Sequence, residues 1–225
     1  MLLLTLSNFI GFGISTLVTL FISIHLIGSY FKSREKTVGY FAGFIATRLG
    51  LFFFSSLTSL VYLISGNPLT PAVMFLIAWI LTFISLIFPP LLFTSLKWQA
   101  MKIIYPGTIA GLGILGIISL IKGFTPAIID PKTGLALIIL PQLPQMFYML
   151  SKFFGVTPLA VLFLSQARSG EKWMKARSLL IGLGLLWVVS TIIIPTFLPS
   201  VWAGIYCCIG DILIFTGIKY KKPNI

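Results

Sequence analysis

Acidic residues are nearly absent from this 225-residue chain, which has four Asp and Glu against 16 Lys and Arg. Charged residues make up only 9% of it, whereas about a quarter of a soluble globular domain is charged. This scarcity excludes an ordinary soluble domain. Cysteine is scarce as well: Cys207 and Cys208 are adjacent inside an apolar run, too close together to bridge two structural elements. We expect them to be packed thiols.

The same shortages remove the usual catalytic constellations. Intramembrane aspartyl proteolysis requires two carboxylates within the membrane, and only Asp211 lies in an apolar run. No H-E-x-x-H motif or cluster of His, Cys and carboxylates offers a zinc site, and a Ser–His dyad could use only His25. The last apolar run carries Asp211 where a retinal protein needs a Schiff-base lysine. We therefore expect no catalytic residues, no metal and no cofactor, and a protein that is not an enzyme.

Long hydrophobic runs are what the chain does contain. Its residues are 58% hydrophobic, its mean hydropathy is +1.08, and apolar runs of about 18 or more residues are typical of membrane-spanning helices. The sequence predicts an all-α fold, a polytopic seven-transmembrane-helix bundle that forms one integral membrane domain over residues 1–225. The predicted spans are about 7–31, 38–64, 71–96, 103–121, 144–167, 178–197 and 200–218.

The basic residues predict the orientation of the bundle. The loops after the first, third and fifth spans, together with the tail, hold twelve Lys and Arg, and the alternate loops hold only Lys122 and Lys132. The positive-inside rule then places the N-terminus outside and the C-terminus in the cytoplasm of a prokaryotic-type cell. The net charge of +12 is explained by this topology and by contacts with anionic lipids at the basic inner face, so no nucleic acid is expected as a partner.

Proline and glycine predict finer features of the spans. Pro89-Pro90 should kink the third span, and Pro195 and Pro199 indicate a tight hairpin between the sixth and seventh. Two small-residue steps, Gly39/Gly43 and Gly107/Gly111, predict close helix packing, within the chain first and between copies second.

A polar segment enters the fifth span. Lys152 lies sixteen residues before Arg168, about 24 Å by helical rise, and we expect it to snorkel to the outer headgroups. The other polar residues of this outer-side segment are Gln142, Gln145 and Tyr148.

Arg48 lies in the middle of the apolar run "FAGFIATRLGLFFFSSL". A charge at that depth costs about 2.5–3.5 kcal/mol on insertion scales, so it normally faces a partner or a water-filled cavity. Measured from the inner edge, Asp211 lies at about 12 Å, His25 at about 10 Å and Arg48 at about 16 Å. In a closed ring of seven helices the seventh span packs against the first, which predicts an Arg48–Asp211 ion pair with His25 nearby. Two roles remain open: a structural pair that fixes the seventh helix, or a cluster that binds an anion or relays a proton.

The pattern of charge and apolarity over nearly the whole chain resembles the seven-helix membrane regions of prokaryotic sensor proteins such as histidine kinases. It is carried by "FKSREKTVGYFAGFIATRLGLFFF", "SQARSGEKWMKARSLLIGLGLL" and "ILIFTGIKYKK". The resemblance implies a membrane or ligand input. We expect no kinase domain after the last span, so a chain of this kind would signal through a cytoplasmic or membrane partner.

A shorter segment, "LPQLPQMFYMLSKFFGVTP" at 140–158, is similar to the proline-glutamine motif of PQ-loop transporters, with Pro144 and Gln145 matching it. That resemblance implies transport of a small solute. The leading hypothesis is a non-enzymatic, sensor-like or accessory membrane protein without its own output domain. The alternative is a small-solute transporter of PQ-loop-like type.

Overall fold

The computed structural model describes residues 2–92, 101–126, 128–129, 136–137, 140–168, 171–192 and 200–220. Its elements are α1 (Leu2–Ser33), α2 (Lys36–Ser65), α3 (Leu69–Ser85), α4 (Phe88–Leu91), α5 (Met101–Lys122), β1 (Ile128–Ile129), β2 (Ala136–Leu137), α6 (Gln142–Gln166), α7 (Lys172–Ser190) and α8 (Ser200–Lys219). Seven stretches are long and apolar enough to cross a membrane, and α3 with α4 forms one of them. The predicted all-α class with seven spans is confirmed.

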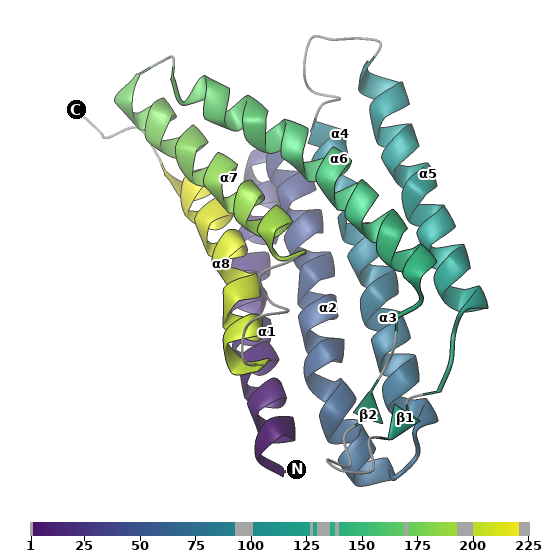
Figure 1. Ribbon diagram of the computed structural model, residues 1–225. Helices are drawn as coiled ribbons and strands as arrows, with labels where there is room; N and C mark the ends of the chain where they lie inside the picture. Colours follow the sequence, from purple (N-terminus) through teal and green to yellow (C-terminus); the bar gives the residue numbers. More distant parts are fainter. Residues whose placement is uncertain are drawn as a thin grey trace.

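The long helices make a closed series of contacts, a ring in which the last helix, α8, lies beside the first, α1 (Figure 1). Each packs against its neighbours along the chain, and α8 packs against α1. The short turns from α1 to α2 and from α2 to α3 impose this order there, because a tight turn leaves two helices antiparallel and adjacent. The turn from α2 to α3 shows how: Gly66 adopts a left-handed φ of 60° after the last helical residue, and the Asn67 side chain accepts a hydrogen bond from the Leu69 amide at 2.9 Å.

The third span is broken, as its two prolines predicted. Helix α3 ends at Ser85, and the chain resumes as α4 at Phe88. Pro89 and Pro90 have no amide hydrogen to donate to the preceding turn, so regular helical bonding stops there. Both prolines are buried, and α4 contacts α2, α5 and α6.

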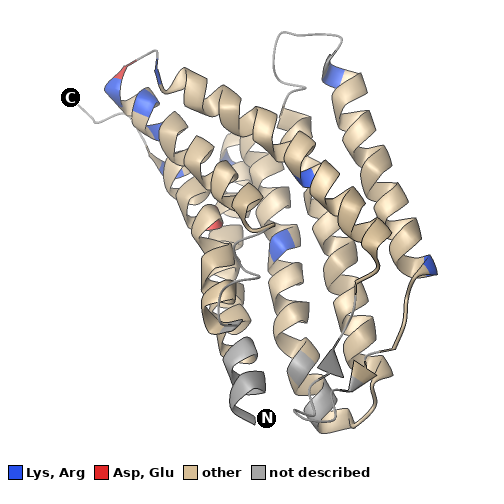
Figure 2. Ribbon diagram, in the orientation of Figure 1, with Lys and Arg blue, Asp and Glu red and all other residues tan. Residues whose placement is uncertain are grey.

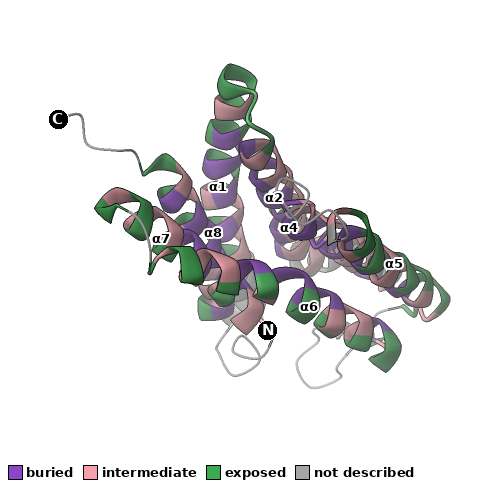
Figure 3. Cartoon of the chain, turned by 90° about the horizontal axis from the view of Figure 1, so that it is seen from above, coloured by how far each residue is buried: buried purple, intermediate pink, exposed green. Residues whose placement is uncertain are grey.

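Apolar side chains cover both the inside and the outside of the ring. Exposed residues such as Leu17, Ile103 and Val161 face outward, as expected where lipid is the solvent. Buried residues occupy the sides of the helices that face one another (Figure 3). The main core cluster lies toward one end of the bundle and includes Phe41, Phe44, Ile45, Val156, Leu159, Ile181, Leu185 and Ile214.

Charged residues gather at that same end (Figure 2). It holds the last turns of α1 and α8 with Lys32 and Lys219, and the first turn of α7 with Lys172. We call it the basic end. Helix α5 finishes with Lys122 at the opposite end. This is the asymmetry on which the predicted orientation rests, and the orientation itself remains a prediction.

Two expectations about the helices need correction. The sixth span, predicted over 178–197, is helical over Lys172–Ser190, with a turn at Thr191 and Ile192. The sequence boundary followed the charges, whereas Lys, Met, Ala and Arg are good helix formers and continue the helix beyond the apolar run. The remainder of that span, the last residues of the third span and the Pro195–Pro199 hairpin lie outside the described residues.

The glycine steps also behave differently from expectation. A Cβ atom at Gly107 or Gly111 would meet nothing within 4 Å, so this step brings together no helices in the described part of the chain. At Gly39 and Gly43 a Cβ would collide with the rings of Tyr30 and Phe88, so these glycines accommodate aromatic side chains.

Candidate intramembrane anion site

Arg48 and Asp211 form an ion pair in the interior of the bundle. Arg48 Nε donates to both carboxylate oxygens of Asp211, at 2.7 and 3.0 Å, although the two residues are 163 positions apart. Both side chains are buried, with 6% and 0% exposed. Because moving an ion out of water costs several kcal/mol, each of these charges requires the other.

The guanidinium has further partners on either side. Arg48 Nη2 donates to the Cys207 carbonyl oxygen at 2.8 Å, and the rings of Phe44 and Phe52 lie 5.5 and 5.1 Å from its central carbon. Phe44, Arg48 and Phe52 are spaced four residues apart on α2, so they stack along one helix face. Aromatic faces attract a cation, most strongly where water is excluded.

Helix α8 presents Asp211 through close backbone packing against α7. A Cβ at Gly184 would lie 2.8 Å from the Gly210 carbonyl oxygen, and one at Gly210 would lie 2.9 Å from the Gly184 oxygen. Any larger residue at either glycine would separate the helices. The Trp187 indole also donates to the Tyr206 carbonyl oxygen at 2.9 Å, which ties the same two helices together. Asp211 follows Gly210 directly and is thereby held inside the ring.

Lys152 belongs to this interior site, so the prediction that it snorkels to the outer headgroups is wrong. It is 2% exposed, and its ammonium donates to the Tyr148 hydroxyl and to Thr191 Oγ1. The Tyr148 ring centroid lies 4.8 Å from Nζ. Tyr148 precedes Lys152 by one helical turn and Thr191 reaches it from the end of α7, so two helices turn the lysine inward.

Arg48 and Lys152 line one cavity of about 230 Å³. Its walls come from five helices, α1, α2, α3, α6 and α8, and from the residues that directly follow α3 and α7. They combine aromatic rings, hydroxyl groups and the two cations. The lining residues are Phe12, Arg48, Leu51, Phe52, Ser55, Phe75, Trp79, Thr82, Ser85, Leu86, Tyr148, Lys152, Thr191 and Cys207.

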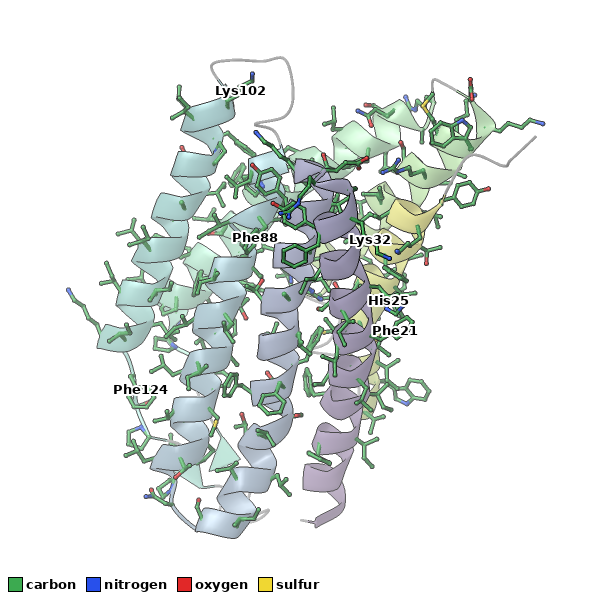
Figure 4. The ribbon with its side chains drawn as sticks, turned by 180° about the vertical axis from the view of Figure 1, so that it is seen from behind. Phe21, His25, Lys32, Phe88, Lys102 and Phe124 are labelled. Atoms are coloured by element: carbon green, nitrogen blue, oxygen red, sulfur yellow. The ribbon has the colours of Figure 1, made fainter. Side chains whose placement is uncertain are left out.

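The remaining predicted site residues lie elsewhere. His25 does not join the cluster: it is exposed, its Nδ1 donates to the Phe21 carbonyl oxygen at 2.9 Å, and it packs against the rings of Phe21 and Phe215. Figure 4 shows it beside Phe21 on α1. The depth estimate was compatible with the pair, but the histidine faces outward around the helix.

Only part of the predicted outer-side polar segment lies at the cavity. Gln142 is exposed in the first turn of α6, and Gln145 donates to the Leu140 carbonyl oxygen at 2.9 Å. Neither glutamine lines the cavity, whereas Tyr148 and Lys152 both do. The amide of Gln145 therefore fixes the approach to α6, and only the second half of the segment contributes to the site.

The charge of the site is unbalanced. Two cations line the cavity, and Asp211 pairs with one of them, Arg48; the structure records no ion pair for Lys152 within the described part of the chain. Burial of an ammonium group with only hydroxyl partners costs free energy, because no opposite charge compensates for the lost water. An anion in the cavity would balance it. No group of three or more His, Cys, Asp and Glu that could hold a metal occurs in the described residues.

Comparisons with known proteins add no relative. No protein-family model, curated protein or solved structure matches the chain. The similarities to sensor membrane regions and to PQ-loop transporters therefore remain sequence-pattern resemblances, and the seven apolar helices define the class: a multi-pass membrane protein.

Proposed function

We propose that this chain is a non-enzymatic, receptor-like membrane protein that binds a small organic anion in the cavity beside Arg48 and Lys152. The observation that supports this is the buried Lys152 ammonium, which lines the cavity with hydroxyl partners and, among the described residues, no carboxylate in contact. Intramembrane ionisable groups that line a cavity commonly mark ligand or ion sites.

The size and lining of the cavity favour an acid with a compact apolar part. An engineered cavity of about 150 Å³ binds benzene, and this one measures about 230 Å³. Phe52, Phe75 and Trp79 would contact the apolar part of the ligand, while Lys152 and the nearby hydroxyls would hold its carboxylate. Such a ligand uses every chemical feature of the wall.

The position of the core favours a protein that binds a ligand over one that transports it across the membrane. The packed cluster of Phe41, Phe44 and Ile45 lies on α2 between Arg48 and the basic end. A ligand in the cavity is therefore separated from that end by closely packed side chains. In a sensor or accessory protein of the cytoplasmic membrane, ligand binding would shift the helices around this core, and the basic end would contact a cytoplasmic or membrane partner and anionic lipids.

Binding measurements on the purified protein test the proposal. A panel of small aromatic and aliphatic carboxylates should raise the melting temperature of the wild-type protein in detergent, and the matching uncharged amides should not. Lys152→Met should weaken carboxylate binding at least about thirtyfold, because removing one partner of a buried charge pair costs about 2–5 kcal/mol. Lys122→Met, which removes an exposed lysine at the end of α5, is the matched control. Equal stabilisation by acids and amides would contradict an anion site.

Transport of a small anion is the second candidate, and one observation favours it. Ser15, Thr19 and Ser23 form a buried hydroxyl stripe on α1 that passes Asp211 at Thr19, and the Ser23 hydroxyl has no hydrogen-bond partner in the described part of the chain. A transporter requires a polar route open alternately to both sides. Saturable uptake of a labelled carboxylate into proteoliposomes, lost in Lys152→Met, would establish transport. Binding without uptake would support the receptor-like function instead.

A further inference from the structure

Two adjoining pockets lie at the basic end, away from the intramembrane cavity. The larger, of about 530 Å³, is lined by Lys32 in the last turn of α1, Lys219 in the last turn of α8 and Arg177 on α7. The smaller, of about 210 Å³, is lined by apolar residues that include Phe41, Phe163 and Ile181. Val38, Trp173, Arg177 and Ile218 line both. The two pockets are therefore neighbours that share a wall, one basic and one apolar.

We propose that this pair of pockets binds an anionic phospholipid, with the phosphate among Lys32, Arg177 and Lys219 and an acyl chain in the apolar pocket. Glu35 is the acidic residue in the lining of the basic pocket, so its three cations leave a net positive charge. Basic pockets between membrane helices on the cytoplasmic side bind lipid headgroups in this way.

The local contacts hold the basic side chains in positions where they could bind a lipid headgroup. Lys219 Nζ donates to Ser29 Oγ at 2.7 Å, which holds the end of α8 against α1 and places Lys219 on the same side as Lys32. Arg177 is half-buried and lines both pockets, so its guanidinium stands where a headgroup meets its chain. Trp173 lies at the same boundary, the position that indole rings favour in membranes.

The apolar pocket decides between a lipid and free phosphate. A phosphate ion would use only the basic pocket and would leave the slot beside Phe163 and Ile181 unfilled. A phospholipid fills both and keeps its chain in an apolar environment. None of Arg48, Lys152 and Asp211 lines either pocket, so this site stands independently of the proposed anion cavity.

Trp173 provides the reporter for an experiment. The full-length protein is reconstituted in phosphatidylcholine vesicles that contain increasing fractions of either phosphatidylglycerol or phosphatidylcholine with brominated acyl chains, which quench indole fluorescence on contact. The share of the quenching that disappears in Trp173→Phe is assigned to this site. We expect brominated phosphatidylglycerol to reach half-maximal quenching at a membrane fraction at least about fivefold lower than brominated phosphatidylcholine.

Variants show whether the cations cause this preference. Arg177→Gln and Lys219→Gln should each raise the required fraction of anionic lipid about fivefold, since one basic residue near the surface contributes about 1 kcal/mol. Arg177→Lys should retain the preference. Lys102→Gln, which removes a lysine near the start of α5 at the same end but far from Lys32 (Figure 4), should change nothing.

The proposal would be overturned by equal quenching of Trp173 by both brominated lipids, by an unchanged preference in both Arg177→Gln and Lys219→Gln, or by an equal loss in Lys102→Gln. Relief of the quenching by millimolar inorganic phosphate would assign the pockets to a free ion and would also overturn it.

Discussion

The side chain of Lys152 is long enough to carry its ammonium toward the membrane surface, yet it turns inward to Tyr148 and Thr191. Helical rise gives the depth of a residue, but its direction depends on which face of the helix meets the neighbouring helices. The sequence did contain a signal for that direction, because Tyr148, Lys152 and Val156 are spaced four residues apart and so share one helix face. In the structure Val156 is wholly buried, which shows that this face points inward. On α1 the direction of the side chain likewise differs between neighbours, since Leu26 is buried and His25 is exposed.

Removal of one partner from the Arg48–Asp211 pair should destabilise the protein strongly. Arg48→Ala or Asp211→Ala should each cost about 3–5 kcal/mol, because each leaves an uncompensated buried charge. The double variant should lose less than the sum of the two, as measured by unfolding in mixed micelles.

His25→Ala is the control for this cycle, and we expect it to cost less than about 0.5 kcal/mol because its side chain is exposed. Strictly additive losses at Arg48 and Asp211 would contradict the pairing.

At the scale of elements, the sequence predicted which segments are helical better than it predicted how they pack. Apolar runs and breakers such as Pro89-Pro90 act locally, so the seven spans and the break in the third could be predicted from them. The glycine contacts could not, because a small-residue step brings two helices together only where a partner helix faces it. Thus Gly184 and Gly210 join α7 and α8, while Gly107 and Gly111 face open space. The Ile128–Ile129 strand pairing with Ala136–Leu137 was also not predicted, although the intervening "DPKTG" contains turn residues.

Substitution of these glycines should separate the two cases. Gly184→Leu or Gly210→Leu should force α7 and α8 apart, displace Asp211 and lower stability by at least about 1–3 kcal/mol, the usual cost of overpacking. Gly107→Leu and Gly111→Leu on α5 should be tolerated, because nothing lies within 4 Å of the new Cβ. Melting temperatures in one detergent compare the four variants, and equal losses on α5 and on α8 would contradict the packing described for α7 and α8.

At the scale of the whole molecule, the core, the pockets and the cavity lie in two different halves of the ring. The basic end contains the packed core and the predicted lipid pockets, and the other half contains the cavity with Arg48 and Lys152. Sequence charge counts predict which end faces the cytoplasm, but the cavity could not be predicted from them, since five helices contribute its walls.

The predicted orientation has a direct test. In a cysteine-free background, Ser33→Cys at the α1–α2 turn should react with a membrane-impermeant thiol reagent only after the membrane is opened, because we expect the basic end to face the cytoplasm. Asn67→Cys at the α2–α3 turn should react in intact cells. Both side chains are exposed, so the opposite result would reverse the orientation.

The central claim, a cavity whose charge selects anions, can be measured through a residue in its own wall. Cys207 lines the cavity, and Cys208→Ser leaves it as the single thiol of the chain. An anionic methanethiosulfonate should modify Cys207 at least about tenfold faster than a cationic one of the same size, since focused charge in a cleft changes association rates about 10–10³-fold. Lys152→Met should remove most of that difference, and Lys122→Met should preserve it. Faster modification by the cationic reagent, or no modification by either, would contradict an accessible anion site in this protein.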